Sequence, residues 1–283
     1  MILITWNVQW CCGLDGRVDV ERIVRGARAL GDFDVLCLQE VASNYPRLAG
    51  NAGDDQPARL AALLPGWEIA FGAAVDERGP DGRRQRFGNL VATRLPLLQV
   101  QHQALPWPAD AGVRCMPRMC TTATVQAAWG PLRVSTTHLE FYSPRQRLAQ
   151  ARALRALHAQ AAALAAEPPS PDDDGSPFQA KPHTPDALLT GDFNFETTAE
   201  EYALLTAPGD DGGQLHDGWR RVHGERPHDP TFRVFDRTYG PVPLACDFVF
   251  ASASVAPRLR RMQVDGTTQA SDHQPVLVEL SDG

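Results

Sequence analysis

Ile2-Leu3-Ile4-Thr5-Trp6-Asn7-Val8 opens the chain as an apolar, β-branched run, and Val35-Leu36-Cys37-Leu38 is a second run of the same character. In the segment between them, apolar side chains recur at helical spacing, at Val20, Ile23, Val24, Ala27 and Leu30. Asp19 is a suitable N-cap for this helix, and Gly31 is a suitable residue to end it. A strand, an amphipathic helix and a buried strand in this order predict an α/β layered fold.

The rest of the chain adds mostly sheet to this unit. Further strands are predicted at residues 89–93, 121–127, 132–137, 187–190, 248–250 and 276–280. An Ala-rich helix is predicted over 149–166, with Leu154 and Leu164 toward the core and His158 away from it.

A Pro- and Asp-rich segment follows that helix. Residues 167–185 contain six Pro and three consecutive Asp, which predicts a solvated connection. It could be a linker between two domains. Because the motifs on its two sides belong to one set, we expect instead a surface loop within a single domain that spans 1–283.

Composition excludes several classes of protein. Of the 283 residues, 43% are hydrophobic and 22% are charged, so the chain can bury a core and is not disordered as a whole. The net charge of −7 argues against binding nucleic acid or anionic lipid by overall charge, although a local basic patch remains open. No apolar run reaches the roughly 18 residues of a membrane span.

The N-terminus and the cysteines indicate a compartment. Residues 1–7 contain no basic stretch followed by a long apolar run, so no secretory signal is predicted. The six Cys include no C-x-x-C pair. We therefore expect reduced thiols and a cytoplasmic protein, without a membrane partner and monomeric.

Polar side chains follow four of the predicted strands. Asn7 follows the strand predicted at 2–6, Glu40 the one at 35–38, His138 the one at 132–137 and Asp192 the one at 188–190. Taken singly, each is explained by a turn or by a solvated strand exit. Because strand ends form the binding crevice in layered α/β proteins, the four together predict one site. The amide oxygen of Asn7 and the carboxylate of Glu40 are hard donors suited to Mg²⁺, with Mn²⁺ as a plausible substitute.

Two more stretches carry candidate residues. In Thr190-Gly191-Asp192-Phe193-Asn194, the two-residue spacing can aim a carboxylate and an amide into one cleft, although a plain turn is an alternative. The carboxylate could accept a proton from water while Asn194 holds that water. Near the C-terminus, Asp272 and His273 form a second pair, and Asp247 is the candidate to orient the imidazole.

Other features carry less information. Arg83-Arg84-Gln85-Arg86 is a short basic run that fits a solvated loop, or a patch that steers a phosphodiester toward the cleft. The spacing of His216, His223 and His228 argues against a zinc site. No serine stands in a G-x-S-x-G context, which argues against a serine hydrolase.

The motifs in chain order are TWNVQW, LQEV, THLE, GDFN, CDFVF and SDH. This set resembles the endonuclease/exonuclease/phosphatase superfamily, which includes deoxyribonuclease-like and exonuclease III-like nucleases, neutral sphingomyelinase, inositol polyphosphate 5-phosphatase and tyrosyl-DNA phosphodiesterase of the second kind. The resemblance extends over residues 1–280. It implies a four-layered α/β sandwich, with two mixed β-sheets packed face to face, helices outside, and the site at one end.

The resemblance also implies a metal side to the site. Glu40 matches the principal Mg²⁺ ligand of the family, Asn7 matches its companion, and Asp272 matches the carboxylate near the metal. The chain departs from the family at Ala245-Cys246, where many members have an arginine or a similar polar residue before the aspartate that Asp247 matches.

The remaining matches are implied to act on the phosphate. Asp192 matches the residue that activates the attacking water, and Asn194 matches its orienting neighbour. His138 and His273 match imidazoles that contact the scissile phosphate, and Asp247 matches the residue that supports the second of them.

The expected function is a Mg²⁺-dependent phosphodiesterase or nuclease that cleaves a phosphoester, possibly DNA. A phosphomonoesterase acting on a sugar, inositol or lipid headgroup phosphate is the alternative. A non-catalytic binding protein on the same scaffold is disfavoured because every motif residue is present. Substrate contacts are expected on loops at 43–59 and 72–88, and no membrane-inserting apolar hairpin is evident.

Overall fold

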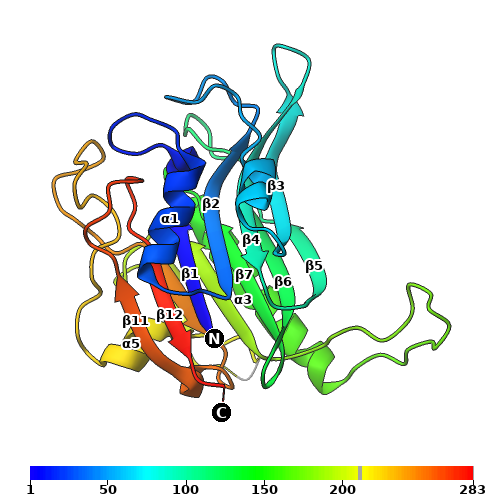
Figure 1. Cartoon of the computed structure of the whole chain (residues 1–283). Coiled ribbons are helices and arrows are strands. Elements are labelled where there is room, and N and C mark those ends of the chain that lie inside the picture. The colour runs from blue at the N-terminus through cyan, green and yellow to red at the C-terminus, as the bar shows by residue number, and fades with distance from the viewer. Residues whose placement is uncertain (210–211, 283) are drawn as a thin grey trace.

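The computed structural model describes residues 1–209 and 212–282. In this part of the chain, two mixed six-stranded sheets pack face to face between helices (Figure 1). The first sheet has the order β11 (Leu259–Val264), β12 (Val276–Leu280), β1 (Ile2–Asn7), β2 (Val35–Ser43), β4 (Arg84–Thr93), β3 (Glu68–Arg78). The second has the order β5 (Leu97–Ala104), β6 (Met119–Ala127), β7 (Gly130–His138), β8 (Ala187–Asp192), β10 (Asp247–Ala251), β9 (His216–Asp217).

Helices flank these sheets. They are α1 (Val20–Leu30), α2 (Gln56–Leu63), α3 (Pro144–Ala166), α4 (Glu200–Thr206) and α5 (Gly218–His223), with 3₁₀ turns η1 (Gln9–Cys11) and η2 (Ala256–Arg258). The side chain of Asp19 accepts a hydrogen bond from the Arg22 backbone, so the predicted N-cap of α1 is confirmed.

Three apolar clusters separate four layers. The central cluster joins the inner faces of the two sheets, with Val35 and Cys37 from β2 against Val134 from β7. A second cluster lies between the first sheet and α1 and α2, and a third lies between the second sheet and α3 and α4. The central strands β1 and β2 are buried on both faces, which explains their continuous apolar runs. The predicted four-layered α/β sandwich is confirmed.

The structure corrects three sequence expectations. Residues 72–88 are not a loop, since most of them lie in the β3–β4 hairpin. The Ala-rich helix begins at Pro144 rather than at 149, because Ser143 caps it by accepting from the Gln146 backbone. On that helix His158 is buried, at 7% exposure, while Leu164 is 39% exposed.

The segment predicted as a surface loop joins α3 to β8. The connection between α3 and β8 lies within the described range, contains no helix or strand, and extends away from the sheets (Figure 1). Its most exposed apolar side chain is Phe178, at 74%.

Gly191 lets two strands approach each other at the end where the polar residues gather. Its φ is +137°, and a Cβ atom there would lie 1.9 Å from the Thr137 carbonyl oxygen on β7. Gly130 has a similar φ of +133° but has no atom within 4 Å of the corresponding position, which makes it a matched control.

We expect Gly191→Ala to destabilise the protein far more than Gly130→Ala. Both variants carry the backbone strain of a positive φ, about 1–3 kcal/mol, but only the first adds a clash with backbone. Urea denaturation of the two variants measures the difference, expected to be at least about 2 kcal/mol. Equal losses of stability would contradict the close approach of β7 and β8.

Candidate active site

The ends of four strands meet at one edge of the sandwich. β1 and β2 run parallel. β1 ends at Asn7, whereas Glu40 lies within β2, which continues to Ser43, and not after that strand as the sequence indicates. β7 and β8 also run parallel, with His138 directly opposite Asp192. β10 is antiparallel to β8 and places Asp247 opposite Asp192. The register therefore brings these residues to one place from segments far apart in the sequence, as the sequence predicts.

A bulge turns Glu40 into the cleft. The pairing of β2 with β4 shifts register between Leu38 and Val41, and Glu40 has a φ of +59°. A bulge of this kind re-aims one side chain without ending the strand. Asn194 also has a positive φ, +52°, in the turn after β8. Such backbone strain is often found at functional sites.

Asn7 links the two acidic residues of the site. Its Nδ2 donates to Glu40 Oε1 at 3.1 Å and to Asp192 Oδ2 at 2.9 Å. Its Oδ1 accepts from the Gln9 backbone nitrogen at 3.1 Å. The amide thus presents nitrogen to both carboxylates, and coordination of a metal by the Asn7 oxygen stays a prediction.

Glu40 and Asp272 form a negatively charged end of the cleft. Burial, and next the charge of Asp272, raise the pKa of Glu40 to about 7. Burial also raises the pKa of Asp272, whose Oδ2 accepts from Gln9 Nε2 at 2.9 Å. Two neighbouring carboxylates whose negative charges repel each other in a largely buried site fit a hard divalent cation.

Asp192 stands at the centre. Its Oδ1 accepts from the Asn194 backbone nitrogen at 3.0 Å, while Oδ2 lies 3.4 Å from His138 Nε2 and 3.6 Å from His273 Nε2. Burial raises the pKa of the Asp192 carboxyl above its usual value. The Oδ2 atom, surrounded by donors, is the atom best placed to exchange a proton.

The two histidines differ in charge. Burial, together with the nearby Arg118 and His273, holds the pKa of His138 well below its usual range, so this ring is neutral. Burial opposes a charge on His273 as well. The carboxylates of Asp247 and Asp192 nevertheless raise the pKa of His273 well above its usual value.

A carboxylate and an aromatic ring hold His273 in place. Its Nδ1 lies 2.9 Å from Asp247 Oδ2, and the Phe232 ring stacks on it with a centroid distance of 4.3 Å. The Trp6 indole donates to the His273 carbonyl at 2.9 Å. The predicted pairing of Asp247 with His273 is therefore present, with Phe232 as a partner that the sequence did not indicate.

A second group of possible metal ligands includes a thiol. Ligand atoms of Asp192, Cys246, Asp247 and His273 lie within 4.8 Å of one another. Burial, and then the two neighbouring aspartates, raise the pKa of Cys246 well above its usual value, so the thiol stays protonated. A neutral thiol beside a charged imidazole suits a hard cation less well than Glu40 and Asp272 do.

The cleft above these residues has a volume of about 460 Å³ and an aromatic wall. Arg114 and the ion pair between Arg118 and Glu140, at 3.2 Å, also line it. The aromatic residues of the wall are Trp10, Phe87, Phe141, Tyr142, Phe232 and Tyr239. Gln9, Trp10 and Glu140 lie inside the TWNVQW and THLE motifs, which is the one sequence signal that could have found them.

Three of the remaining arginines form ion pairs outside the cleft. Arg83 pairs with Asp81 and Arg84 with Asp76 on the surface. Arg147, on α3, pairs with Glu201 at 3.0 Å and donates to the carbonyls of Glu140 and Phe141. It supports the loop that carries the THLE motif.

The fold and the site define a hydrolase of phosphoester bonds. The model of the endonuclease/exonuclease/phosphatase family matches residues 4–273, and the chain belongs to this family.

Solved structures share the fold. A family member from Beutenbergia cavernae is 26% identical, with a TM-score of 0.67 over 98% of this chain and 70% of that one. A mannosyl-6-phosphatase from Bacteroides thetaiotaomicron is 18% identical, with a TM-score of 0.69 and 99% of each chain covered. D. rerio TDP2 complexed with single-strand DNA product is 20% identical, with a TM-score of 0.62 over 98% and 97%. No curated protein gave a match.

Two further findings bear on the surroundings of the protein. Within the described residues, no helix has the length and apolar character needed to cross a bilayer. All six cysteines lie in this part of the chain, and they are free thiols.

Proposed function

We propose that the protein is a Mg²⁺-dependent phosphodiesterase, with Mn²⁺ as a working substitute, that cleaves a P–O bond by in-line attack of water. The observation that carries the proposal is the position of Asp192 Oδ2 between Asn7, His138 and His273. A carboxylate surrounded by donors in this way can take a proton from water beside a bound phosphate.

Glu40 and Asp272 would hold the cation, and Asn7 would fix the direction of Glu40. When bound, the cation supplies positive charge to the phosphoryl oxygens as the transition state develops.

The other side chains position the reactants. Asp192 accepts the proton of the attacking water, and Asn194, whose Nδ2 donates to the Leu139 carbonyl at 2.9 Å, offers its amide oxygen to that water. The charged His273 ring donates from Nε2 to a non-bridging oxygen, and neutral His138 donates one N–H to the phosphate. Asp247 is a positioning residue that acts through His273. Rate enhancement comes mainly from orientation and from stabilised charge.

The charges of the cleft favour a diester over a monoester. Its cations in the described structure are Arg114, Arg118 and the His273 ring, and Arg118 is already paired with Glu140. Four carboxylates face them, those of Glu40, Glu140, Asp192 and Asp272. A phosphodiester brings one negative charge where a monoester brings close to two.

The aromatic wall supports a substrate with flat organic groups. Phe141 contacts Tyr142 and Tyr239 with centroid distances of 4.8 and 5.8 Å, and Arg114 lies over the Tyr142 ring. Exposed aromatic rings of this kind stack on nucleobases. We therefore propose nucleotide diesters, including single-stranded DNA ends, as the substrate class.

A substrate panel tests this proposal. With Mg²⁺ we expect hydrolysis of bis-p-nitrophenyl phosphate and single-stranded DNA at rates at least about 100-fold above those for inositol and sugar monophosphates, a difference of about 2.7 kcal/mol in activation free energy. Chelator should stop the reaction. Preferential release of inorganic phosphate from the monoesters would overturn the proposal in favour of a phosphomonoesterase.

A further inference from the structure

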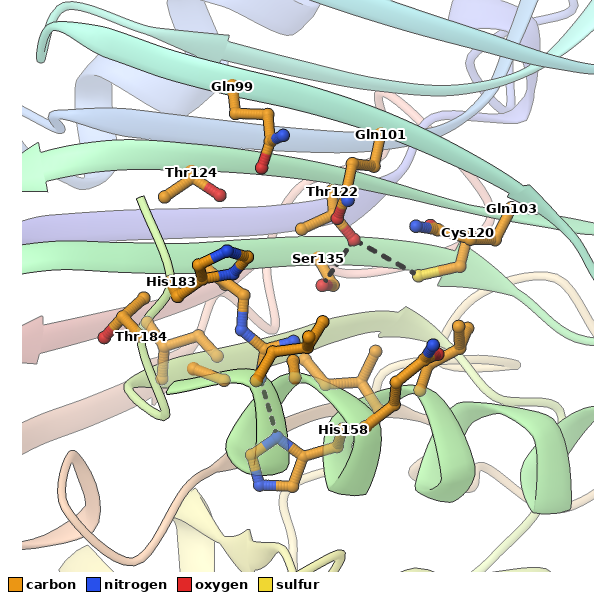
Figure 2. A pocket seen from close by; sticks show the side chains of 18 of the residues that line it. Gln99, Gln101, Gln103, Cys120, Thr122, Thr124, Ser135, His158, His183 and Thr184 are labelled. Atoms are coloured by element: carbon orange, nitrogen blue, oxygen red, sulfur yellow. Dashed lines mark hydrogen bonds between the residues drawn. The ribbon is translucent and has the colours of Figure 1, made fainter. Parts of the chain in front are cut away.

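A second pocket, of about 270 Å³, lies on the outer face of the second sheet. β5, β6 and β7 form its floor, α3 forms one wall, and residues 181–184 of the loop before β8 form another (Figure 2). Figure 2 shows His183 lying between the side chains of the sheet and His158 on α3. None of its lining residues is among those that line the catalytic cleft.

Strand register builds a polar floor. On β6, Thr124 pairs with Gln99 of β5 and with Arg133 of β7. Two residues away along the same strand, Thr122 pairs with Gln101 and Ser135. Side chains two residues apart on a strand share a face, so these six groups point to the same side of the sheet. The alternate residues of β6 and β7, such as Val125 and Val134, are in the central apolar cluster.

The guanidinium of Arg133 has no carboxylate partner within the described structure. Among the described residues it forms no ion pair, and its buried Nε has no hydrogen-bond partner. Its Nη2 lies 2.9 Å from His158 Nδ1. Because a guanidinium only donates, Nδ1 of His158 is the acceptor of this contact. Burial lowers the pKa of Arg133 to about 10, which still leaves it charged at neutral pH.

The side chains that line this pocket include basic groups, although the chain as a whole has a negative net charge. No Asp or Glu is found among the described residues that line it, whereas Lys181 and His183 contribute basic groups. Lys181, the only lysine of the sequence, donates to the carbonyls of Pro177 and Gln179 and so also shapes the loop at the pocket rim. With a net charge of −7 for the chain, a half-buried arginine without a carboxylate partner is costly in such a place unless an anion joins it.

We infer that this pocket binds the phosphate group of a small hydroxylated molecule. The Arg133 guanidinium forms an ion pair with the phosphate. The hydroxyl of Thr124 and the amides of Gln99 and Gln101 form hydrogen bonds with the phosphate oxygens and with the hydroxyl groups of the ligand. The volume suits a ligand of a few carbons. Arg133 precedes His138 by five residues of β7, roughly 16 Å along the strand, so this site is separate from catalysis and does not depend on the proposed function.

Calorimetric titration with orthophosphate and with glycerol 3-phosphate, in chelator, tests the inference. We expect Arg133→Gln to weaken binding of both probes at least tenfold and the isosteric Thr124→Val to weaken it several-fold, with hydrolysis of bis-p-nitrophenyl phosphate unchanged. Thr124→Val keeps the test decisive if the arginine variant does not fold. Arg260→Gln, on the exposed side of β11, is the matched control and should bind like the wild type.

The histidine ring resonances locate the anion. Orthophosphate should shift the His183 signals of the wild type, identified by their loss in His183→Gln, and should leave them in place in Arg133→Gln. Binding that is unchanged in both pocket variants, or shifts confined to His138 and His273, would overturn the inference, as would the absence of any binding.

Discussion

Asp192→Asn is expected to lower kcat for bis-p-nitrophenyl phosphate by roughly 10³-fold while KM changes little. The amide keeps the size of the carboxylate but cannot take the proton of the attacking water, and general-base catalysis typically contributes 10²- to 10⁴-fold. Steady-state kinetics at saturating Mg²⁺ measures the effect, and urea denaturation checks that the variant remains folded.

Asp217 offers a matched control. It is also a buried aspartate, accepting from the Tyr202 hydroxyl at 2.7 Å and from the Trp219 backbone at 2.8 Å, but it lies outside the cleft. Asp217→Asn should reduce stability and keep kcat per folded molecule within about threefold of the wild type. Activity of Asp192→Asn at a similar level would refute the role given to Asp192.

Glu40→Gln is expected to abolish the response of the protein to divalent cations. We expect Mn²⁺ affinity to fall at least tenfold and turnover at millimolar Mg²⁺ to fall at least about 100-fold, because a direct ligand is lost. The Tm of the metal-free protein should rise, since one of two neighbouring carboxylates whose charges repel each other is gone. The increase in Tm that Mg²⁺ gives the wild type should disappear in this variant.

Glu200→Gln, an exposed carboxylate on α4, controls for the loss of charge and should match the wild type in all three measurements. If Glu40→Gln bound Mn²⁺ with unchanged affinity, the cation would have to bind elsewhere. The group around Cys246 would then be the first place to examine.

The fold was predictable where the residue pattern is strong. β1 and β2 follow from continuous apolar runs and α1 from helical spacing of apolar residues within the first forty residues, and α1 has its predicted cap. β3, β5 and β11 were not predicted, because strands at or near a sheet edge keep many side chains exposed and lack a continuous apolar run. Five of the eight residues of β5 are exposed, as is expected of an edge strand.

His158 shows why an amphipathic pattern misleads on α3. A polar residue on a helix usually faces solvent, but His158 lies where α3 packs on the polar part of the sheet face, beside Arg133. The character of that face depends on the register of β5, β6 and β7, which no local pattern reports. The same long-range register creates the pocket around Arg133.

The candidate site was predictable as a set of residues but not as a network. Polar residues at the ends of parallel strands indicate a shared edge, and the structure brings all eight of the predicted residues to it. The donor role of the Asn7 amide, the stacking of Phe232 on His273 and the bulge that turns Glu40 are results of packing. Motif spacing carries no information on these contacts.

Anomalous diffraction from crystals grown with Mn²⁺ tests whether Glu40 and Asp272 hold the catalytic cation. We expect an anomalous peak bound by carboxylate oxygens of Glu40 and Asp272, on the Asn7 side of Asp192, and the disappearance of this peak in Glu40→Gln. A peak on Cys246, Asp247 and His273 instead, or no peak near Glu40 in crystals that hydrolyse substrate, would contradict it.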